Sequence, residues 1–444
     1  MTVLTGFLIL LLACIGNAEL WVVLINRWHS RRSRHEALRR IRRFHDVGVL
    51  LFPPFIFWVA GLCDNGLLRG GTYQDLSGSV QALLAVAGTG LIPFVASVSL
   101  WQTRGRTSRL KRTTADVFDV LALAESDQQR DDVIGNPDSW LSGFPGNQIF
   151  QLEVNTKQLL VHRGGLRKPR TIPRQISKLV NSVTKRTGVL SMSARPTVSA
   201  AVRSAKHSLM PQALKLGHLS DVHLIGCPGR EYYRFVTEQL CRMQPDAFVF
   251  TGDLIDNASL LPWATEMFQR LADVAPGYFI LGNHDWHLDY EAVRAALVAT
   301  GWTDLGQKSE IVCLGDWNVL IAGTEAPWIG SNPDVPLRED EHLRILLSHT
   351  PDQRDFAVSS DIDLMLSGHN HGGQVVLPIV GPVYSPSQFG VRYSGGVYEF
   401  RDLLIHVSRG CGAMDPLRFN CRPEITLLEL QVAMPHSLSE KPTT

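Results

Sequence analysis

The feature that most limits the fold of this chain is a nearly uncharged apolar stretch, Val3 to Ile25, near its N-terminus. A helix needs about 20 apolar residues to cross a hydrocarbon core about 30 Å thick, and this stretch supplies them. A cluster of arginines follows this stretch, and no basic residue precedes it. This order is expected of a membrane anchor and not of a cleaved signal peptide. We therefore expect a membrane helix over about residues 3–25.

Two further apolar stretches, Val47 to Cys63 and Val80 to Leu100, predict two more membrane helices at about 47–63 and 80–100. The first of these two contains Pro53 and Pro54, which a spanning helix accommodates with a kink. Residues 1–112 are thus expected to form a transmembrane region with three helices. The alternative for the second and third stretches is a buried or re-entrant helical hairpin.

Charge is distributed very unevenly, although the formal net charge is only +1. Residues 1–112 carry 14 Lys and Arg against 5 Asp and Glu, and their basic clusters follow the first and third apolar stretches. Because basic segments next to membrane helices stay on the cytoplasmic side, both clusters are expected in the cytoplasm. This predicts a multi-pass protein of the inner (cytoplasmic) membrane in which everything after residue 112 is cytoplasmic.

Residues 113–213 are expected to be a linker with a basic insertion. Its first part, around Asp116 to Leu123, has an acidic, helix-like pattern. Ile149 to Val154 then has the composition of a strand, with Gln158 to Val161 as its hairpin partner.

The insertion itself, residues 166–206, contains ten Lys and Arg and no acidic residue. Ile176, Leu179, Val180 and Val183 form an apolar stripe at helical spacing, which would suit a helix lying on an anionic membrane surface. A solvated linker helix or a disordered insertion explains the pattern equally well. Nucleic acid is not expected as a partner, because aromatic residues for base stacking are absent there. The oligomeric state is left open.

From Leu214 onward, apolar strand-like runs alternate with helical patterns, as in a layered α/β domain. Five of these runs end in side chains that can bind metals: Asp221 and His223; Asp253 and Asp256; Asn283 and His284; His349; His369 and His371. In such folds the carboxyl ends of neighbouring strands meet at one edge of the sheet, where ligands bind. We therefore expect these side chains to form one site.

Carboxylates, an amide and imidazoles without thiolates suit Mn²⁺, Fe²⁺ or Zn²⁺, and a bridging carboxylate would allow two such ions to bind side by side. Two cations can bind phosphoryl oxygens and also generate hydroxide at neutral pH. The seven cysteines include no CxxC pair, which argues against a thiolate metal site or a disulfide framework. The sequence thus predicts two divalent metal ions as cofactors, of unspecified identity.

The motifs Asp-x-His, Gly-Asp-x-x-Asp, Gly-Asn-His-Asp, a lone His and Gly-His-x-His occur in this order between residues 221 and 371. In this respect the chain resembles the calcineurin-like metallophosphoesterase superfamily over about residues 214–430. The resemblance implies an α/β fold, a two-sheet α/β sandwich, here preceded by the helical transmembrane region. Residues 431–444 are expected to be a flexible C-terminal tail.

The resemblance also assigns a role to each motif residue. It implies one metal bound by Asp221, His223 and His371, a second bound by Asn283, His349 and His369, and Asp253 as the bridging ligand. It places His284 over the scissile phosphate to stabilise the transition state and protonate the leaving oxygen, with Asp256 orienting it. Asp285 is expected to be a structural turn carboxylate.

Residues 368–375, Gly-His-Asn-His-Gly-Gly-Gln-Val, with Ser408-Arg409-Gly410 and Pro416-Leu417-Arg418, are similar to a bacterial membrane-associated branch. That branch includes cell-envelope phosphoesterases and UDP-2,3-diacylglucosamine pyrophosphatases. Asn370 stands where the branch more often has Thr, and we expect it to tune the site without abolishing it.

The function expected from these observations is that of a metallophosphoesterase, an enzyme that uses a dinuclear metal-activated hydroxide on a phosphodiester or pyrophosphate. Its substrate would be a membrane lipid or a lipid-linked nucleotide sugar such as UDP-2,3-diacylglucosamine. One alternative is a broad-specificity phosphodiesterase on soluble or wall-linked substrates, with the helices only as a tether. A more remote one is a non-catalytic metal-bound scaffold, against which the complete ligand set argues.

Overall fold

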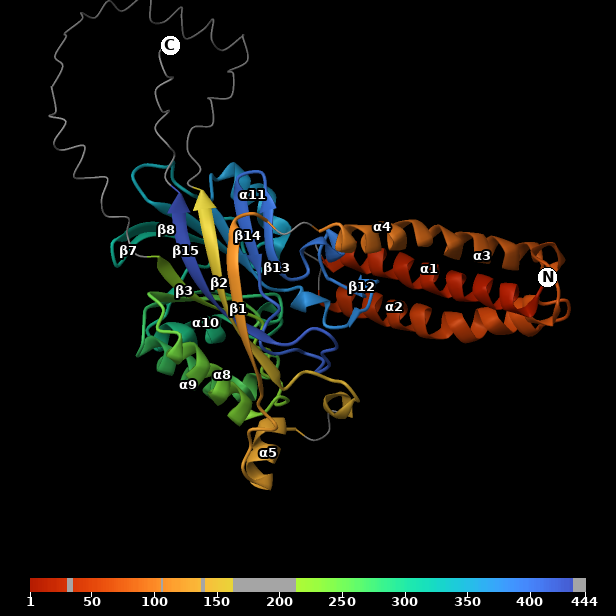
Figure 1. The fold of residues 1–444 in the computed structure, drawn as a ribbon, viewed down its shortest axis with the longest axis horizontal. Coiled ribbons are helices and arrows are strands. Elements are labelled where there is room, and N and C mark those ends of the chain that lie inside the picture. Colours follow the sequence, from red (N-terminus) through yellow and green to blue (C-terminus); the bar gives the residue numbers. More distant parts are fainter. Residues whose placement is uncertain (30–34, 105–106, 137–139, 163–212, 434–444) are drawn as a thin grey trace, which may run out of the picture.

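The structure is a computed structural model that describes residues 1–29, 35–104, 107–136, 140–162 and 213–433. It consists of a long helical bundle that projects from one side of an α/β domain (Figure 1). The N-terminus lies at the far end of the bundle. The chain crosses the length of the bundle three times before it enters the α/β domain.

The bundle is built from α1 (Val3–His29), α2 (His35–Ile56) with the π-helix η1 (Phe57–Leu62), and the consecutive helices α3 (Gly78–Thr89) and α4 (Leu91–Gln102). Short 3₁₀ turns η2 (Leu67–Arg69) and η3 (Tyr73–Asp75) connect η1 to α3. Among the described residues, three segments are long and apolar enough to cross a membrane: Val3–Trp28, Arg43–Leu62 and Gly78–Gln102. This confirms the three predicted apolar helices, although α2 begins earlier than expected, within the basic segment.

Small residues let the helices of the bundle approach one another closely. A Cβ atom added to Gly16 of α1 would lie 2.0 Å from the carbonyl oxygen of Ala87 in α3, and one added to Gly90 would lie 1.9 Å from the carbonyl oxygen of Gly16. Close backbone contact through small residues is typical of helices packed in a membrane. Along α2 the chain stays helical through Pro53 and Pro54 and then changes to the π-helix η1.

The α/β domain contains two large sheets and a small hairpin. The first sheet has the strand order β1 (Leu110–Asp119), β2 (Gln151–His162), β15 (Glu424–Ala433), β3 (Leu214–Leu219), β4 (Ala247–Thr251), β5 (Gly277–Ile280), β6 (Thr303–Asp304). The second has the order β13 (Gly396–Phe400), β14 (Leu403–Val407), β10 (Leu364–Ser367), β9 (Leu343–Ser348), β8 (Trp317–Thr324), β7 (Ser309–Leu314). The hairpin pairs β11 (Val376–Leu377) with β12 (Gly381–Pro382).

Helices cover the outer faces of the two sheets, which confirms the predicted two-sheet α/β sandwich (Figure 1). The remaining helical elements are α5 (Asp127–Ile134), η4 (Trp140–Gly143), α8 (Arg230–Arg242), η5 (Ala258–Leu260), α9 (Leu261–Ala272), η6 (Asp285–His287), α10 (Tyr290–Ala299), η7 (Pro351–Gln353), α11 (Arg354–Ser359), η8 (His371–Gly373) and η9 (Gly390–Tyr393). Helices α8, α9 and α10 pack on the first sheet, and α11 packs on the second.

The core follows the two-residue period of the strands. In β4, Phe248 and Phe250 face the helices α8 and α9, whereas Ala247 and Val249 face the second sheet. Because successive side chains point to opposite faces, a strand buried on both faces has a continuous apolar sequence. Strands β3 to β6 run parallel, as do β8, β9, β10 and β14, so their carboxyl ends align at one edge of each sheet.

Two local predictions in the middle segment were wrong. In the region predicted to be an acidic helix, residues 116–119 belong to strand β1, which pairs antiparallel with β2 at the edge of the first sheet, and residues 120–123 form a turn. The predicted hairpin at residues 149–161 is instead the single long strand β2, paired with β1 and β15. Its buried positions include Asn155 and Lys157, and these polar side chains interrupt the apolar alternation that would have revealed one strand.

The first sheet therefore starts at Leu110, and residues 110–162 belong to the α/β domain instead of to a linker. The insertion that remains between β2 and β3 contains the basic segment 166–206, which lies outside the described residues. The predicted C-terminal tail, 431–444, also lies outside them from residue 434 onward.

Several contacts fix the end of the bundle to the α/β domain. Gln102 at the end of α4 donates a hydrogen bond from Nε2 to the carbonyl oxygen of Ile379 at 2.8 Å, within the β11–β12 hairpin. The buried Arg109 pairs with Glu399 at 3.1 Å and donates to the carbonyl oxygen of Asp402 at 2.8 Å. The bundle and the domain thus have a defined relative position.

Candidate metal centre

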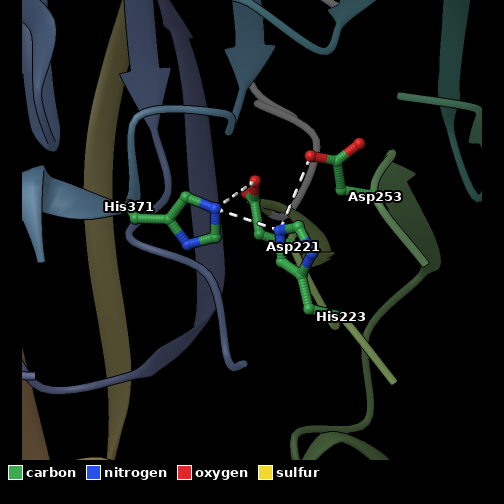
Figure 2. Close-up of side chains that lie close together, drawn as sticks. All are labelled: Asp221, His223, Asp253 and His371. Carbon is green, nitrogen blue, oxygen red and sulfur yellow. Dashed lines mark hydrogen bonds and ion pairs between the residues drawn. The ribbon is translucent and has the colours of Figure 1, made fainter. Parts of the chain in front are cut away.

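Nine predicted site residues lie just beyond the carboxyl ends of the five strands β3, β4, β5, β9 and β10. They are Asp221, His223, Asp253, Asp256, Asn283, His284, His349, His369 and His371. Figure 2 shows four of them converging: Asp221 and His223 from the loop after β3, Asp253 from the loop after β4 and His371 from the loop after β10. The structure therefore brings the predicted residues together, as the parallel strand arrangement requires.

The backbone of this site is strained. Asp221, His223, Asp253, His369 and His371 all have positive φ angles, between 46° and 69°. Such left-handed conformations cost about 1 kcal/mol or more per non-glycine residue and persist where the surrounding structure enforces them, which is common at functional sites.

Glycines in the motifs give the carboxylates room. A Cβ atom on Gly368 would lie 2.0 Å from Oδ2 of Asp221, and one on Gly282 would lie 2.2 Å from Oδ1 of Asp253. The glycines of the Gly-His-x-His and Gly-Asn-His-Asp motifs are therefore required by the close approach of a ligand carboxylate.

One group of potential ligand atoms comprises Asp221, His223, Asp253 and His371, all within 4.8 Å of one another. Nε2 of His223 lies 3.0 Å from Nε2 of His371 and 3.5 Å from Oδ2 of Asp253, and Nε2 of His371 lies 3.4 Å from Oδ1 of Asp221 (Figure 2). Two imidazoles and two carboxylates directed at one point are a donor set suited to a borderline divalent cation.

A second group comprises Asp253, His349 and His369, again within 4.8 Å. Nε2 of His349 lies 3.1 Å from Oδ2 of Asp253, 3.0 Å from Oδ1 of Asn283 and 3.2 Å from Nδ1 of His369. Asp253 belongs to both groups, so the donor set fits two cations that share this carboxylate.

The opposite ring nitrogens of these histidines have their own partners. Nδ1 of His349 lies 2.7 Å from the carbonyl oxygen of Thr251, and Nε2 of His369 lies 2.9 Å from that of Pro386. Nδ1 of His223 lies 2.7 Å from Oδ2 of Asp256. Such contacts orient an imidazole and direct its other nitrogen toward a metal.

Arg418 supports His371, a role that sequence analysis did not assign. It is fully buried, and its guanidinium donates to the carbonyl oxygen of His371 at 2.8 Å and to the ring at 3.2 Å. Burial, His223 and Arg418 together hold the pKa of His371 well below its usual range. A neutral imidazole is the form that binds a metal. The Pro-Leu-Arg motif at residues 416–418 was the available signal.

His284 and Asp256 form a pair beside the ligand groups. Nδ1 of His284 lies 2.5 Å from Oδ1 of Asp256. Burial alone would lower the pKa of His284, but the negative charge of Asp253 and the hydrogen bond and charge of Asp256 raise it to about 9. The pKa of Asp256 is held well below its usual range, because His223 and His284 outweigh the effect of burial. His284 can therefore carry a proton at neutral pH.

Asp285 is a structural carboxylate, as predicted. It is fully buried and accepts hydrogen bonds from the backbone N–H groups of Gly282, Asp253, Leu254 and Ile255, at 2.9–3.3 Å. It thereby joins the loops after β4 and β5, which carry Asp253 and His284.

A cavity of about 230 Å³ opens over this centre. One wall contains ligand-group residues such as His223, Asp253 and His371, as well as Asn370, whose Nδ2 donates to the carbonyl oxygen of Tyr393 at 2.8 Å. The other wall includes Ile25 of α1 and the neighbouring pair His45 and Asp46 of α2. Sequence analysis missed these three residues, because no motif connects the bundle to the site.

Comparison with known proteins gives a consistent result. The family model for calcineurin-like phosphoesterases matches residues 214–373. Phosphodiesterase YaeI of Escherichia coli is 31% identical over 229 residues, which cover 49% of this chain and 82% of that protein. The uncharacterized metallophosphoesterase YkuE of Bacillus subtilis is 33% identical over 240 residues, which cover 51% of this chain and 83% of that protein. A transmembrane protein with metallophosphoesterase domain of Bos taurus is 29% identical over 290 residues, which cover 58% of this chain and 62% of that protein.

Proposed function

Since this chain belongs to the calcineurin-like phosphoesterase family, we propose that it hydrolyses a phosphodiester or pyrophosphate bond of a lipid at the membrane surface. Family membership makes it a hydrolase of phosphoester bonds, dependent on a dinuclear metal centre. The lipid or lipid-linked nucleotide sugar, such as UDP-2,3-diacylglucosamine, is the proposal. The observation that carries it is the cavity wall formed by Ile25, His45 and Asp46, near the ends of two segments that are long and apolar enough to span a membrane.

In this proposal Asp221, His223 and His371 would hold one ion, Asn283, His349 and His369 would hold the other, and the carboxylate of Asp253 would be shared by both. Two bound ions neutralise charge on phosphoryl oxygens and make a water nucleophilic at neutral pH. The protein supplies the rest of the chemistry. His284, protonated and lining the cavity, donates its proton to the leaving oxygen, and Asp256 holds its ring in place.

The assay uses the full-length protein in lipid nanodiscs with Mn²⁺, Fe²⁺ or Zn²⁺. Substrates are bis-p-nitrophenyl phosphate, UDP-2,3-diacylglucosamine and a panel of phospholipids. His284→Ala should lower kcat by about 10²–10⁴-fold with its metal content unchanged, because only the proton donor is lost. Asp253→Ala should lose both turnover and metal. Asp316→Ala, at an exposed carboxylate in the β7–β8 turn, is the matched control.

Turnover retained in both active-site variants would contradict the assignment of the site. If the wild-type protein cleaves the soluble diester but no lipid, the helices are only a tether for a broad-specificity phosphodiesterase, and the lipid proposal fails.

The proposal includes an orientation: a multi-pass protein of the inner membrane, with the α/β domain in the cytoplasm next to anionic lipid. Its support is the position of the basic residues. The first and third spanning segments end, and the second begins, at the domain end of the bundle (Figure 1). Arg27, Arg43 and Arg109 lie at or just beyond these segment ends in the sequence. Cys63, beyond η1 at the far end, and Cys313, on β7, are both exposed thiols. A membrane-impermeant maleimide added to spheroplasts should label Cys63, and should label Cys313 only after permeabilisation. The reverse pattern would place the domain outside.

A further inference from the structure

The cavity over the metal centre is formed by two separate parts of the chain. The loops of the α/β domain provide the ligand side. The C-terminal part of α1 provides Ile25, and the start of the second spanning segment, within α2, provides His45 and Asp46. Within the described residues, this is where the bundle meets the catalytic side chains. Its volume of about 230 Å³ is below the 300–1,000 Å³ of pockets that enclose a whole drug-sized ligand. A headgroup fits, whereas acyl chains must remain outside.

The position of the wall matches the membrane boundary. The first candidate spanning segment ends at Trp28 and the second begins at Arg43, so Ile25, His45 and Asp46 all lie within one turn of the end of a spanning segment. The hydrophobic core of a bilayer stops at this level and the headgroups begin. A lipid whose chains remain in the bilayer therefore presents its phosphate at the height of the cavity.

His45 and Asp46 are held in a defined position. The Trp21 ring of α1 packs edge-on to His45, with ring centroids 6.4 Å apart, and Nδ1 of His45 lies 2.9 Å from Oδ1 of Asp46. Asn17 donates to the carbonyl oxygen of Gly48 at 3.2 Å, which fixes the register of α2 against α1. A Cβ atom on Gly48 would lie 2.4 Å from the Trp21 ring, so glycine is needed there for this approach.

The chemistry of the pair differs from that of the metal side. Its carboxylate is about half exposed to the cavity mouth, and it accepts from the His45 ring, which leaves the second carboxylate oxygen available. Cations on the far wall would attract the phosphate, whereas a carboxylate on the near wall repels a second phosphate and accepts hydrogen bonds from hydroxyl or ammonium groups.

We infer that His45 and Asp46 bind the headgroup of a membrane phospholipid whose phosphate lies at the metal centre, and select a hydroxyl- or ammonium-bearing headgroup over one with a further phosphate. This inference rests on the proposed hydrolysis of a lipid phosphoester and narrows it to a substrate class. His45 and Asp46 are specificity-determining residues in this arrangement, and His284 remains the proton donor.

The experiment uses full-length protein in nanodiscs with Mn²⁺ and three substrates: phosphatidylglycerol, phosphatidylglycerol phosphate and soluble bis-p-nitrophenyl phosphate. The first two differ only by one phosphate on the headgroup. Asp46→Asn should lower kcat/KM for phosphatidylglycerol about tenfold, the loss expected from one charge-assisted hydrogen bond, mainly through KM. It should raise the relative rate on phosphatidylglycerol phosphate and leave the soluble substrate within about twofold. His45→Ala should also lower the phosphatidylglycerol rate alone.

Asp64→Asn, at an exposed carboxylate at the far end of the bundle, is the matched control and should leave all three rates unchanged. An equal loss on lipid and soluble substrates, or no loss on phosphatidylglycerol, overturns the inference. Cleavage of the soluble diester with no lipid cleavage by the wild-type protein also overturns it while leaving the hydrolase intact. Failure to cleave any of the three contradicts the proposed function itself.

Discussion

At the residue scale, the pair His284 and Asp256 gives a prediction about pH. A proton donor must be protonated, so activity that depends on His284 is present below its pKa and is lost as pH rises through it. The charges of Asp253 and Asp256 raise this pKa to about 9, against the effect of burial. Asp256→Asn removes one of these charges, and the basic limb of the profile of log(kcat/KM) against pH should move down by about one pH unit or more.

Bound cations lower the pKa of His284 in both proteins, so the direction of the difference between them is retained. Asp316→Asn, far from the site, should leave the profile unchanged. A basic limb that stays in place in Asp256→Asn would show that His284 is not the group that titrates there.

The nine predicted site residues could be recognised from sequence because each motif is local. Asp221 and His223, for example, are two positions apart and therefore lie on the same loop, and the parallel sheet brings such loops together. Arg418 and His45 could not be assigned in this way. Arg418 reaches His371 from 47 positions away, and His45 reaches the cavity from another part of the molecule. Contacts of this kind depend on tertiary packing and have no spacing that a sequence pattern could reveal.

At the element scale, the packing of α1 against α3 gives a second prediction. Gly16→Val would place side-chain atoms within the backbone of Ala87, because even a Cβ atom would lie 2.0 Å from its carbonyl oxygen. The helices must separate, and the free energy of unfolding of the bundle should fall by about 1–3 kcal/mol, as for overpacked interiors. Thermal or denaturant unfolding in detergent micelles measures this.

Gly88→Val is the matched control, because a Cβ atom at Gly88 would have no atom within 4 Å. The same residue type is then introduced one position from Ala87 without a clash. Equal destabilisation by the two substitutions would show that the cost arises from helix propensity and not from the α1–α3 contact.

Elements differ in how well the sequence predicts them. The central strands β4, β5 and β10 are short, mostly apolar runs buried on both faces, so composition identifies them. Strands β3 and β9 also contain polar residues, such as Lys215 and Arg344, beside their apolar ones. The edge strand β1 is almost entirely exposed and carries Lys111, Arg112 and Asp116, as edge strands do. In β2, the buried Lys157 pairs with Glu424 of β15 at 3.4 Å. Its partner is 267 positions away, so the sequence pattern gave no reason to bury a lysine.

At the scale of the whole molecule, the uneven distribution of charged residues along the chain corresponds to two parts with different roles, the helical bundle and the α/β domain. Basic residues gather where the bundle meets the α/β domain, and the acidic residues of the domain include the carboxylates of the metal centre. The cavity lies between these parts, so its shape depends on how the bundle is attached. Activity on a lipid should therefore depend on this attachment, whereas activity on a small soluble diester should depend on the domain loops alone.

The contact between Trp101 of α4 and Gly381 of the β11–β12 hairpin tests this dependence. A Cβ atom on Gly381 would lie 2.4 Å from Cγ of Trp101, so Gly381→Val must push the bundle and the hairpin apart. Gly381 also has a φ of 90°, and part of the cost is backbone strain. Gly315→Val, in the β7–β8 turn with a φ of 58° and open space around it, reproduces the strain without the clash.

We expect Gly381→Val to lower kcat/KM for phosphatidylglycerol in nanodiscs by about tenfold or more. A displacement of about 1 Å in the residues that position a substrate can lower the reaction rate by about a hundredfold. The rate on bis-p-nitrophenyl phosphate should stay within about twofold, because the ligand loops are unchanged. Gly315→Val should affect neither rate. If Gly381→Val lowers the rates on both substrates equally, the hairpin supports the metal centre directly, and the bundle does not form a functional wall of the cavity.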